Sequence, residues 1–270
     1  MIDALNAAAA RRETPCGTGR MVWRIWNAAA GQPLLLLHGG NGSWRHWIHT
    51  IPAFAATRCV IAPDLPGLGE SDLPPDPQEP ASIAAMVAAG LPAITTRPVD
   101  LAGFSFGANV GGQAAARLGP AVRSALLVGA GALGTARGET PLVKVRDKEG
   151  AARVAAHRHN LASLMIADPA RIDDLALAIQ EWNTLHARFR SRGFTTLDGL
   201  ARALPDITGP VAALWGAEDQ VAKATLDARI AALRAARPEA PVTLVPGAGH
   251  WVAYEAPAAF NAALAAWLAR

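Results

Sequence analysis

One serine of this chain stands in a glycine-flanked segment that suits nucleophilic chemistry. In Gly103–Gly107, Ser105 follows a short apolar run that predicts a strand, and it precedes a stretch that predicts a helix. Such a strand–turn–helix lifts the serine hydroxyl above the sheet, at the positive end of the helix dipole. The same residues would also suit a glycine-rich phosphate loop or a plain tight turn. The context favours Ser105 as a nucleophile.

A serine hydroxyl is a weak nucleophile and needs a base. Of the seven histidines, only His250 follows a late strand, in a glycine-rich loop. The loop after the preceding strand offers Glu218 and Asp219 as the orienting acid, and the spacing does not choose between them. The order serine, acid, histidine is the one expected for such a sheet. His38 also follows a strand and competes as a base. The two glycines after it indicate instead a structural role, in which His38 braces the loop that follows its own strand.

Acyl transfer also needs N–H donors for the oxyanion that develops on the substrate. One donor is expected from the backbone of Phe106, directly after the nucleophile. The other is expected from Gly40, in the loop that follows the run Pro33–Leu37. Because glycine has no Cβ, the backbone of this loop can approach a substrate closely.

Six short apolar runs predict strands that are buried on both faces. They are Pro33–Leu37, Arg58–Ala62, Val99–Gly103, Ala125–Val128, Val211–Trp215 and Val242–Val245. Helical patterns fall between them, near Trp44–Phe54, Ala81–Ala89, Ala108–Leu118, Ala222–Ala236 and Pro257–Leu268. This alternation predicts an α/β fold with a mostly parallel sheet, in which ligands bind beyond the carboxyl ends of the strands. Before it, Met21–Trp26 predicts an edge strand, and the first 20 residues are expected to be partly frayed.

The alternation is interrupted between Leu133 and Pro205, where no strand is predicted. Asp168–Pro169 is a helix-start signal, since Asp caps a helix and Pro suits its first position. Apolar residues then recur every three or four positions, at Ile172, Leu175, Ile179, Trp182, Leu185 and Phe189. We therefore expect residues 133–205 to form a helical cap, or lid, inserted into an α/β core made of residues 1–132 and 206–270.

The composition excludes several classes of protein. Apolar residues make up 51% of the chain and charged residues 17%, which allows a large core and excludes a disordered chain. The net charge is +3 and the basic residues are scattered along the chain, so no nucleic-acid partner is expected. No membrane span, secretory signal, disulfide framework or metal spacing is visible. We expect a cytoplasmic bacterial protein without metal or cofactor that binds a small-molecule substrate, and a homodimer is left open.

Separated motifs in this chain resemble those of the α/β-hydrolase superfamily over nearly its whole length. They are His38–Gly40, Asp64–Asp72, Gly103–Gly107, Trp215–Asp219 and Gly249–Trp251. The resemblance implies the α/β-hydrolase fold, and it selects Asp219 over Glu218 as the triad acid. It also implies that Asp64–Asp72 is a structural turn at the site entrance. Serine at position 105 disfavours haloalkane dehalogenases and epoxide hydrolases, which resemble this fold but use Asp there.

Within that superfamily, Asn160–Pro169 resembles the cap of meta-cleavage-product hydrolases, which cleave carbon–carbon bonds in ring-fission dienones. Trp251 also fits that group. Phe104 and His46 depart from it, because the group commonly has Asn at both places. A cap arginine that holds the substrate carboxylate would have to be Arg188, Arg190 or Arg192, and the sequence does not choose among them.

The sequence thus predicts a serine hydrolase with the triad Ser105, His250 and Asp219. Gly40 and Phe106 form the expected oxyanion hole. The expected substrate is a small or medium apolar carboxylic ester or lactone, cleaved through an acyl-enzyme. A carbon–carbon bond hydrolase is the alternative, and a non-catalytic ligand receptor with the same fold is a further one. The expected substrate contacts are Phe104, Met165, Trp182 and Trp251.

Overall fold

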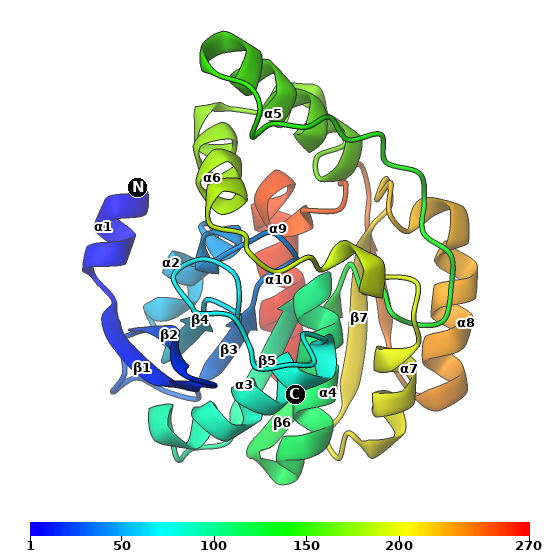
Figure 1. Ribbon diagram of the computed structural model, residues 1–270. Helices are drawn as coiled ribbons and strands as arrows, with labels where there is room; N and C mark the ends of the chain where they lie inside the picture. The colour runs from blue at the N-terminus through cyan, green and yellow to red at the C-terminus, as the bar shows by residue number, and fades with distance from the viewer.

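Eight strands form one sheet through the protein, as the computed structural model of residues 1–270 shows (Figure 1). They are β1 (Ala10–Cys16), β2 (Gly19–Trp26), β3 (Leu34–Leu37), β4 (Val60–Pro63), β5 (Val99–Phe104), β6 (Val122–Val128), β7 (Val211–Gly216) and β8 (Val242–Val245). Their order in the sheet is β1-β2-β4-β3-β5-β6-β7-β8. Only the β1–β2 and β2–β4 pairs are antiparallel. The predicted α/β fold with a mostly parallel sheet is confirmed, and all six predicted strands are present. The prediction that all six are buried on both faces is wrong for β8, which lies at the edge of the sheet and has Thr243 and Leu244 exposed.

Helices cover both faces of this sheet. One face carries α3 (Pro80–Ile94), α4 (Phe106–Leu118) and α8 (Leu226–Ala236), and the other carries α1 (Ile2–Ala7), α2 (Ile51–Ala55), α9 (Val252–Glu255) and α10 (Pro257–Leu268). The helix predicted at Trp44–Phe54 is instead split into a 3-10 turn, η1 (Trp44–Trp47), and α2. Pro52 explains the break, because it has no N–H to continue the hydrogen-bond ladder. None of the helices is long and apolar enough to cross a membrane.

The buried core lies in two layers, one on each side of the sheet. Successive side chains of a strand point to opposite faces, so Leu35 and Leu37 enter one layer while Leu34 and Leu36 enter the other. All four leucines of β3 are fully buried. Burial of each such side chain stabilises the fold by about 1.5–3 kcal/mol. This two-sided burial explains why the central strands are continuous apolar runs in the sequence.

The prediction for the N-terminal region is wrong in two respects. β2 is not an edge strand, because β1 pairs antiparallel along it. The first 20 residues are not frayed, since they form α1 and β1. The indole N–H of Trp23 in β2 donates to the Thr14 hydroxyl of β1 at 2.8 Å, and both side chains are buried. Residues Arg11–Glu13 are exposed and lack the apolar alternation typical of a strand. The sequence pattern therefore does not predict β1.

Between β6 and β7 the chain contains no strand and forms the helices α5 (Gly150–Leu164), α6 (Asp174–Leu185) and α7 (Gly199–Ala203). Figure 1 shows α5 and α6 at the top of the molecule, set apart from the sheet. α7 instead packs against α4, where a Cβ on Gly112 would lie 2.2 Å from the side chain of Leu200. The segment between β6 and β7 therefore packs on both core layers: α7 joins one through Leu200, and α5 and α6 join the other through Leu161 and Ile179.

Helix α6 begins later than the sequence predicts. Asp168 caps only a single 3-10 turn, η3 (Pro169–Arg171). α6 starts after Asp173, whose carboxylate accepts a hydrogen bond from the N–H of Ala176 at 2.8 Å. The predicted apolar stripe is therefore interrupted: Ile172 precedes the helix, Leu185 at its end is 52% exposed, and Phe189 lies beyond it.

Candidate active site

Ser105 lies at the sharp turn between β5 and α4, in an unusual backbone conformation. Its φ of 53° and ψ of −111° cost a non-glycine residue about 1–3 kcal/mol. Its N–H donates to the carbonyl of Val128 at 2.7 Å, which ties the turn to β6. A Cβ on Gly103 would lie 2.4 Å from the carbonyl oxygen of Gly107, and one on Gly107 would lie 2.2 Å from the carbonyl oxygen of Leu37. Both flanking glycines are therefore required by close backbone packing.

The three predicted triad residues meet at the carboxyl edge of the sheet. His250 Nε2 lies 2.8 Å from Ser105 Oγ, and His250 Nδ1 lies 2.7 Å from Asp219 Oδ2. The second carboxylate oxygen of Asp219 accepts hydrogen bonds from the N–H groups of Val221 and Ala222 at 2.8 and 3.2 Å. With Nδ1 donating to Asp219, Nε2 is the atom that can accept the serine proton.

Glu218, the competing acid, lies outside this arrangement. Its side chain is 43% exposed and pairs with Lys223 at the surface. Asp219, by contrast, is 1% exposed and faces His250. The geometry therefore favours the acid that the family resemblance implied.

The two predicted oxyanion donors border the same cavity as Ser105. The N–H groups of Gly40 and Phe106 donate no hydrogen bond within the protein, so both are free to bind a ligand. A Cβ on Gly40 would lie 2.1 Å from the hydroxyl of Ser191 and 3.5 Å from the Cβ of Phe106. Gly40 thus lies close to Phe106 in a space that admits no larger residue.

Two buried histidines form hydrogen bonds with Gly39, next to Gly40 in the same loop. His38 bonds through Nδ1 to the carbonyl of Gly39 at 2.8 Å and accepts the N–H of Leu65 at Nε2, also at 2.8 Å. His46 accepts the N–H of Gly39 at 3.2 Å. Burial lowers the pKa of His38, and burial also holds the pKa of His46 well below its ordinary value. His38 therefore has a bracing position and does not contact Ser105.

The Asp64–Asp72 turn forms a compact hydrogen-bonded unit beside the site. The fully buried Asp64 carboxylate accepts the N–H of Trp44 at 3.0 Å and that of Glu70 at 3.1 Å. It also pairs with the Arg24 guanidinium at 3.2 Å. All these contacts lie within the protein framework, which agrees with a structural turn.

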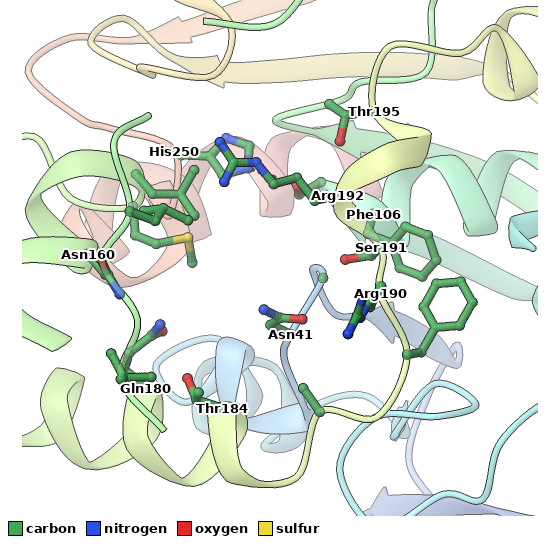
Figure 2. A pocket seen from close by; sticks show the side chains of 18 of the residues that line it. Asn41, Phe106, Asn160, Gln180, Thr184, Arg190, Ser191, Arg192, Thr195 and His250 are labelled. Carbon is green, nitrogen blue, oxygen red and sulfur yellow. Dashed lines mark hydrogen bonds between the residues drawn. The ribbon is translucent and has the colours of Figure 1, made fainter. Parts of the chain in front are cut away.

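A cavity of about 850 Å³ opens above Ser105 and His250. Phe104, Phe106 and Met165 give it apolar walls near the serine, and Leu164 and Phe189 extend them. Figure 2 shows Asn160 of α5 and Gln180 and Thr184 of α6 on the side opposite Phe106. Helices α5 and α6 therefore provide one wall of the cavity.

Two predicted substrate contacts are wrong, because neither side chain lines this cavity. Trp251 is fully buried, its indole N–H donates to the His46 carbonyl at 2.8 Å, and its ring stacks on Tyr254. Trp182 faces η1, where the Arg45 guanidinium lies 3.4 Å from the centre of its ring. Both tryptophans pack protein elements together.

The cavity also carries basic residues, half of which the sequence analysis missed. The predicted candidates Arg188, Arg190 and Arg192 all line it, together with Arg137, Lys144 and Arg146. The loop that bears these three additional residues has no periodicity and no motif, so no local signal marks them. Arg190 forms no hydrogen bond or ion pair in the protein, whereas Arg188 donates to the Ser71 carbonyl. No group of three or more His, Cys, Asp or Glu residues is arranged to hold a metal ion.

The sequence of this chain is similar to sequences of known proteins. A model of the alpha/beta hydrolase family matches residues 34–263. The dihydrolipoyllysine-residue acetyltransferase component of the acetoin cleaving system of Pseudomonas putida is 30% identical over 263 residues, which cover 93% of this chain and 67% of the relative. The 2-hydroxymuconate semialdehyde hydrolase of Pseudomonas sp. (strain CF600) is 36% identical over 109 residues, or 39% of this chain and 38% of the relative. The chain thus matches about two thirds of the first relative's length and well under half of the second's.

Two solved structures share the overall architecture. The esterase RhEst1 from Rhodococcus sp. ECU1013 superposes with a TM-score of 0.75 at 24% identity, covering 97% of this chain and 98% of the esterase. A meta-cleavage product hydrolase from Pseudomonas fluorescens IP01 gives a TM-score of 0.75 at 22% identity, covering 96% and 97%. At such identities the likeness shows the shared fold alone.

Proposed function

This chain belongs to the alpha/beta hydrolase family and is a hydrolase, and we propose that it is a serine hydrolase of small or medium carboxylic esters or lactones. One observation carries the proposal. His250 bridges Ser105 and Asp219 at 2.8 and 2.7 Å, beside a cavity large enough for such a substrate. A nucleophile, its base and the base's orienting acid in hydrogen-bond contact are the machinery of acyl transfer.

In the proposed reaction, Ser105 Oγ attacks the substrate carbonyl and His250 Nε2 takes the hydroxyl proton. The Asp219 carboxylate stabilises the imidazolium that forms. The N–H groups of Gly40 and Phe106 bind the oxyanion, to which they can donate because no protein acceptor occupies them. His250 then protonates the leaving alcohol, and water activated by the same histidine hydrolyses the acyl-enzyme.

Residues 133–205 act in this proposal as a cap that shapes the acyl pocket. Met165 and Leu164, at the end of α5, face the cavity with Phe104 and Phe106 of the β5–α4 turn. These walls suit an apolar segment of the substrate next to the scissile bond. Cap and core together therefore set the size of the acyl group.

A carbon–carbon bond hydrolase of ring-fission dienones is the second candidate. It is favoured by the cationic cavity wall, since such a reaction needs a hold on the substrate carboxylate. Arg190, exposed and unpartnered in the cavity, is available for that contact. The sequence likeness to 2-hydroxymuconate semialdehyde hydrolase also supports this candidate.

Turnover of a substrate panel by the wild type and by Ser105→Ala tests the proposal. The panel holds nitrophenyl esters, lactones and a ring-fission dienone. We expect esters or lactones to be cleaved by the wild type with the highest kcat/KM, and the alanine variant to lose about 10⁴-fold or more. A dienone preferred over every ester, with Arg188, Arg190 or Arg192 needed for the dienone alone, would instead support the carbon–carbon candidate. Retention of a tenth of the activity by Ser105→Ala would refute both.

A further inference from the structure

Arg229 of α8 is a fully buried cation that the proposed reaction does not use. It forms no ion pair within the protein. Its guanidinium donates instead to four neutral oxygens: the Thr225 hydroxyl at 3.1 Å and the carbonyls of Ala130, Ala136 and Val221 at 2.8, 3.1 and 2.9 Å. Burying a charge without a counter-ion costs free energy, so this arrangement indicates a role beyond packing.

One of these contacts, at Val221, reaches the triad acid. Val221 follows Asp219 by two positions in the loop after β7. Its N–H donates to the Asp219 carboxylate at 2.8 Å, while its carbonyl accepts from Arg229 Nη2 at 2.9 Å. The other carboxylate oxygen of Asp219 bonds to His250. Arg229 therefore fixes the residue that holds Asp219 toward His250.

A second contact, at Ala130, lies beside the triad histidine. Ala130 follows β6, and the residue before it, Gly129, has a φ of 58°. A Cβ on Gly129 would lie 3.1 Å from Cε1 of His250, so this segment packs against the imidazole ring. The Ala130 carbonyl accepts from Arg229 Nη1 at 2.8 Å. One guanidinium thus joins the segment beside the His250 ring to the loop of Asp219.

The charge of Arg229 also acts on Asp219. Burial lowers the pKa of Arg229, and the carboxylate of Asp219 is the charge that counteracts this effect. The attraction is mutual, and little water screens it because Asp219 is itself 1% exposed. The buried guanidinium therefore stabilises the Asp219 carboxylate, and its positive charge disfavours a proton on His250 in the resting enzyme.

The other charged or titratable side chains around the triad are placed differently. They are Arg137, Arg192, Glu218, Lys223, Glu255 and His46. The two arginines are at least partly exposed, so water screens their charges. The glutamate and the lysine of the Asp219 loop pair with each other at the surface. Glu255 accepts backbone N–H groups, and burial keeps His46 uncharged by holding its pKa well below its ordinary value.

We propose that Arg229 is a positioning residue of the triad, which holds Asp219 toward His250 through Val221 and stabilises the Asp219 carboxylate with its buried charge. The inference rests on the proposed serine chemistry and adds a residue that acts on it from outside the cavity. Arg229 does not line the cavity, so its effect passes through Asp219. A lysine at this position would keep the charge but lose the planar group that reaches four oxygens.

The rate at which a fluorophosphonate labels Ser105, measured against pH, tests the proposal. Arg229→Gln should reduce the second-order rate constant at neutral pH by about tenfold or more. It should also move the acidic limb of the pH profile up by about half a pH unit or more, because losing a nearby positive charge favours the protonated imidazolium. Arg229→Lys should keep the limb near its wild-type position and regain part of the rate.

Arg237→Gln is the matched control. Arg237 caps the other end of α8 and likewise donates to two backbone carbonyls, those of Ile207 and Gly209, which precede β7. These carbonyls lie at the amino end of β7, opposite the loop of Asp219. The control variant should lose stability without a change in the labelling rate or in the acidic limb.

A double-mutant cycle with Asp219→Asn separates action through Asp219 from a general loss of structure. In the Asp219→Asn background, Arg229→Gln should cost less than about threefold, because the carboxylate on which it acts is gone. An undiminished loss in that background, or an unmoved acidic limb in Arg229→Gln alone, overturns the proposal. If thermal unfolding shows that Arg229→Gln does not fold, the same cycle with Arg229→Lys decides: its loss of rate should shrink likewise, and an undiminished loss overturns the proposal.

The labelling assay also separates this inference from the proposed function, because it needs no particular substrate. A wild type that is labelled on Ser105 but cleaves no ester or lactone contradicts the proposed function alone. A wild type that is not labelled on Ser105 contradicts both.

Discussion

The carboxylate of Glu255 lies 2.7 Å from the backbone nitrogen of Gly249, the residue that precedes His250. The same carboxylate accepts the N–H groups of Ala167 and Asp168 at 3.0 and 2.7 Å. Glu255 is 6% exposed. One buried side chain therefore joins the histidine loop to the segment that follows α5.

This contact predicts that Glu255 positions His250 without touching substrate. In Glu255→Gln one carboxylate oxygen becomes an NH₂ group, which cannot accept the N–H bonds that face it. We expect the acylation rate constant to fall by about tenfold or more, since small displacements of a catalytic group are costly. In a pre-steady-state assay with a nitrophenyl ester, the burst amplitude should stay at one per enzyme while its rate constant falls. Loss of amplitude alone would indicate misfolding and contradict a positioning role, and Glu239→Gln, at the exposed surface, is the matched control.

Asp219→Asn should harm catalysis far more than Glu218→Gln. The carboxylate of Asp219 fixes the histidine tautomer and stabilises the imidazolium, so its removal should reduce kcat by about 10⁴-fold at neutral pH. Glu218 contacts Lys223 at the surface, so its loss should change kcat little. Steady-state kinetics of the two variants check this ranking, and a reversed order would assign the acid to Glu218.

Trp182→Ala should change the stability of the protein, and Met165→Ala should change its substrate specificity. Trp182 packs on Arg45 outside the cavity, and a cation–π contact contributes about 0.5–2 kcal/mol. Its loss should lower the free energy of unfolding and leave the ratio of kcat/KM for short and long acyl esters unchanged. Met165 lines the cavity, so its truncation should shift that ratio by about 1–3 kcal/mol. A shifted ratio in Trp182→Ala would place that ring at the substrate after all.

The buried histidines predict a loss of stability at mildly acidic pH. Burial keeps the pKa of His46 well below 6.5, so below that pH the unfolded chain binds a proton that the folded protein does not. The free energy of unfolding should therefore be fully present above about pH 6.5 and decline as the pH falls, by at most about 1.4 kcal/mol per pH unit for this one group.

Urea unfolding at about pH 7.5 and about pH 5 measures this decline, in a range above that in which carboxylates titrate. His46→Asn keeps an acceptor for the N–H of Gly39 and should reduce the decline. His159→Asn, which changes an exposed histidine, should not reduce it. Equal declines in the wild type and His46→Asn would contradict this origin.

The central sheet could be predicted from the sequence because local patterns encode it. Strands buried on both faces must be apolar throughout, as the four leucines of β3 are. The turn at Ser105 could also be predicted from the sequence, because close packing at Gly103 and Gly107 excludes every other residue type. The edge strand β1 was missed, because an exposed strand needs no apolar alternation.

The parts that sequence reasoning missed depend on contacts between distant segments. Glu255 contacts Ala167, 88 positions away, and no local pattern marks such a contact. Trp182 and Trp251 were assigned to the pocket from their type and position, but the structure places other elements against their rings. Arg137 lies in an irregular loop, and its place in the cavity wall is visible only in the folded structure.

The central claim, that Ser105 is the nucleophile, is tested most directly by covalent labelling. A fluorophosphonate reacts with an activated serine, as the serine oxygen bonds to phosphorus and fluoride leaves. Peptide mass spectrometry of the labelled protein locates the adduct. The account predicts one phosphonyl group per chain, on Ser105, which forms much more slowly in His250→Ala. An adduct on another residue, or hydrolysis of esters that continues while Ser105 is fully labelled, would contradict it.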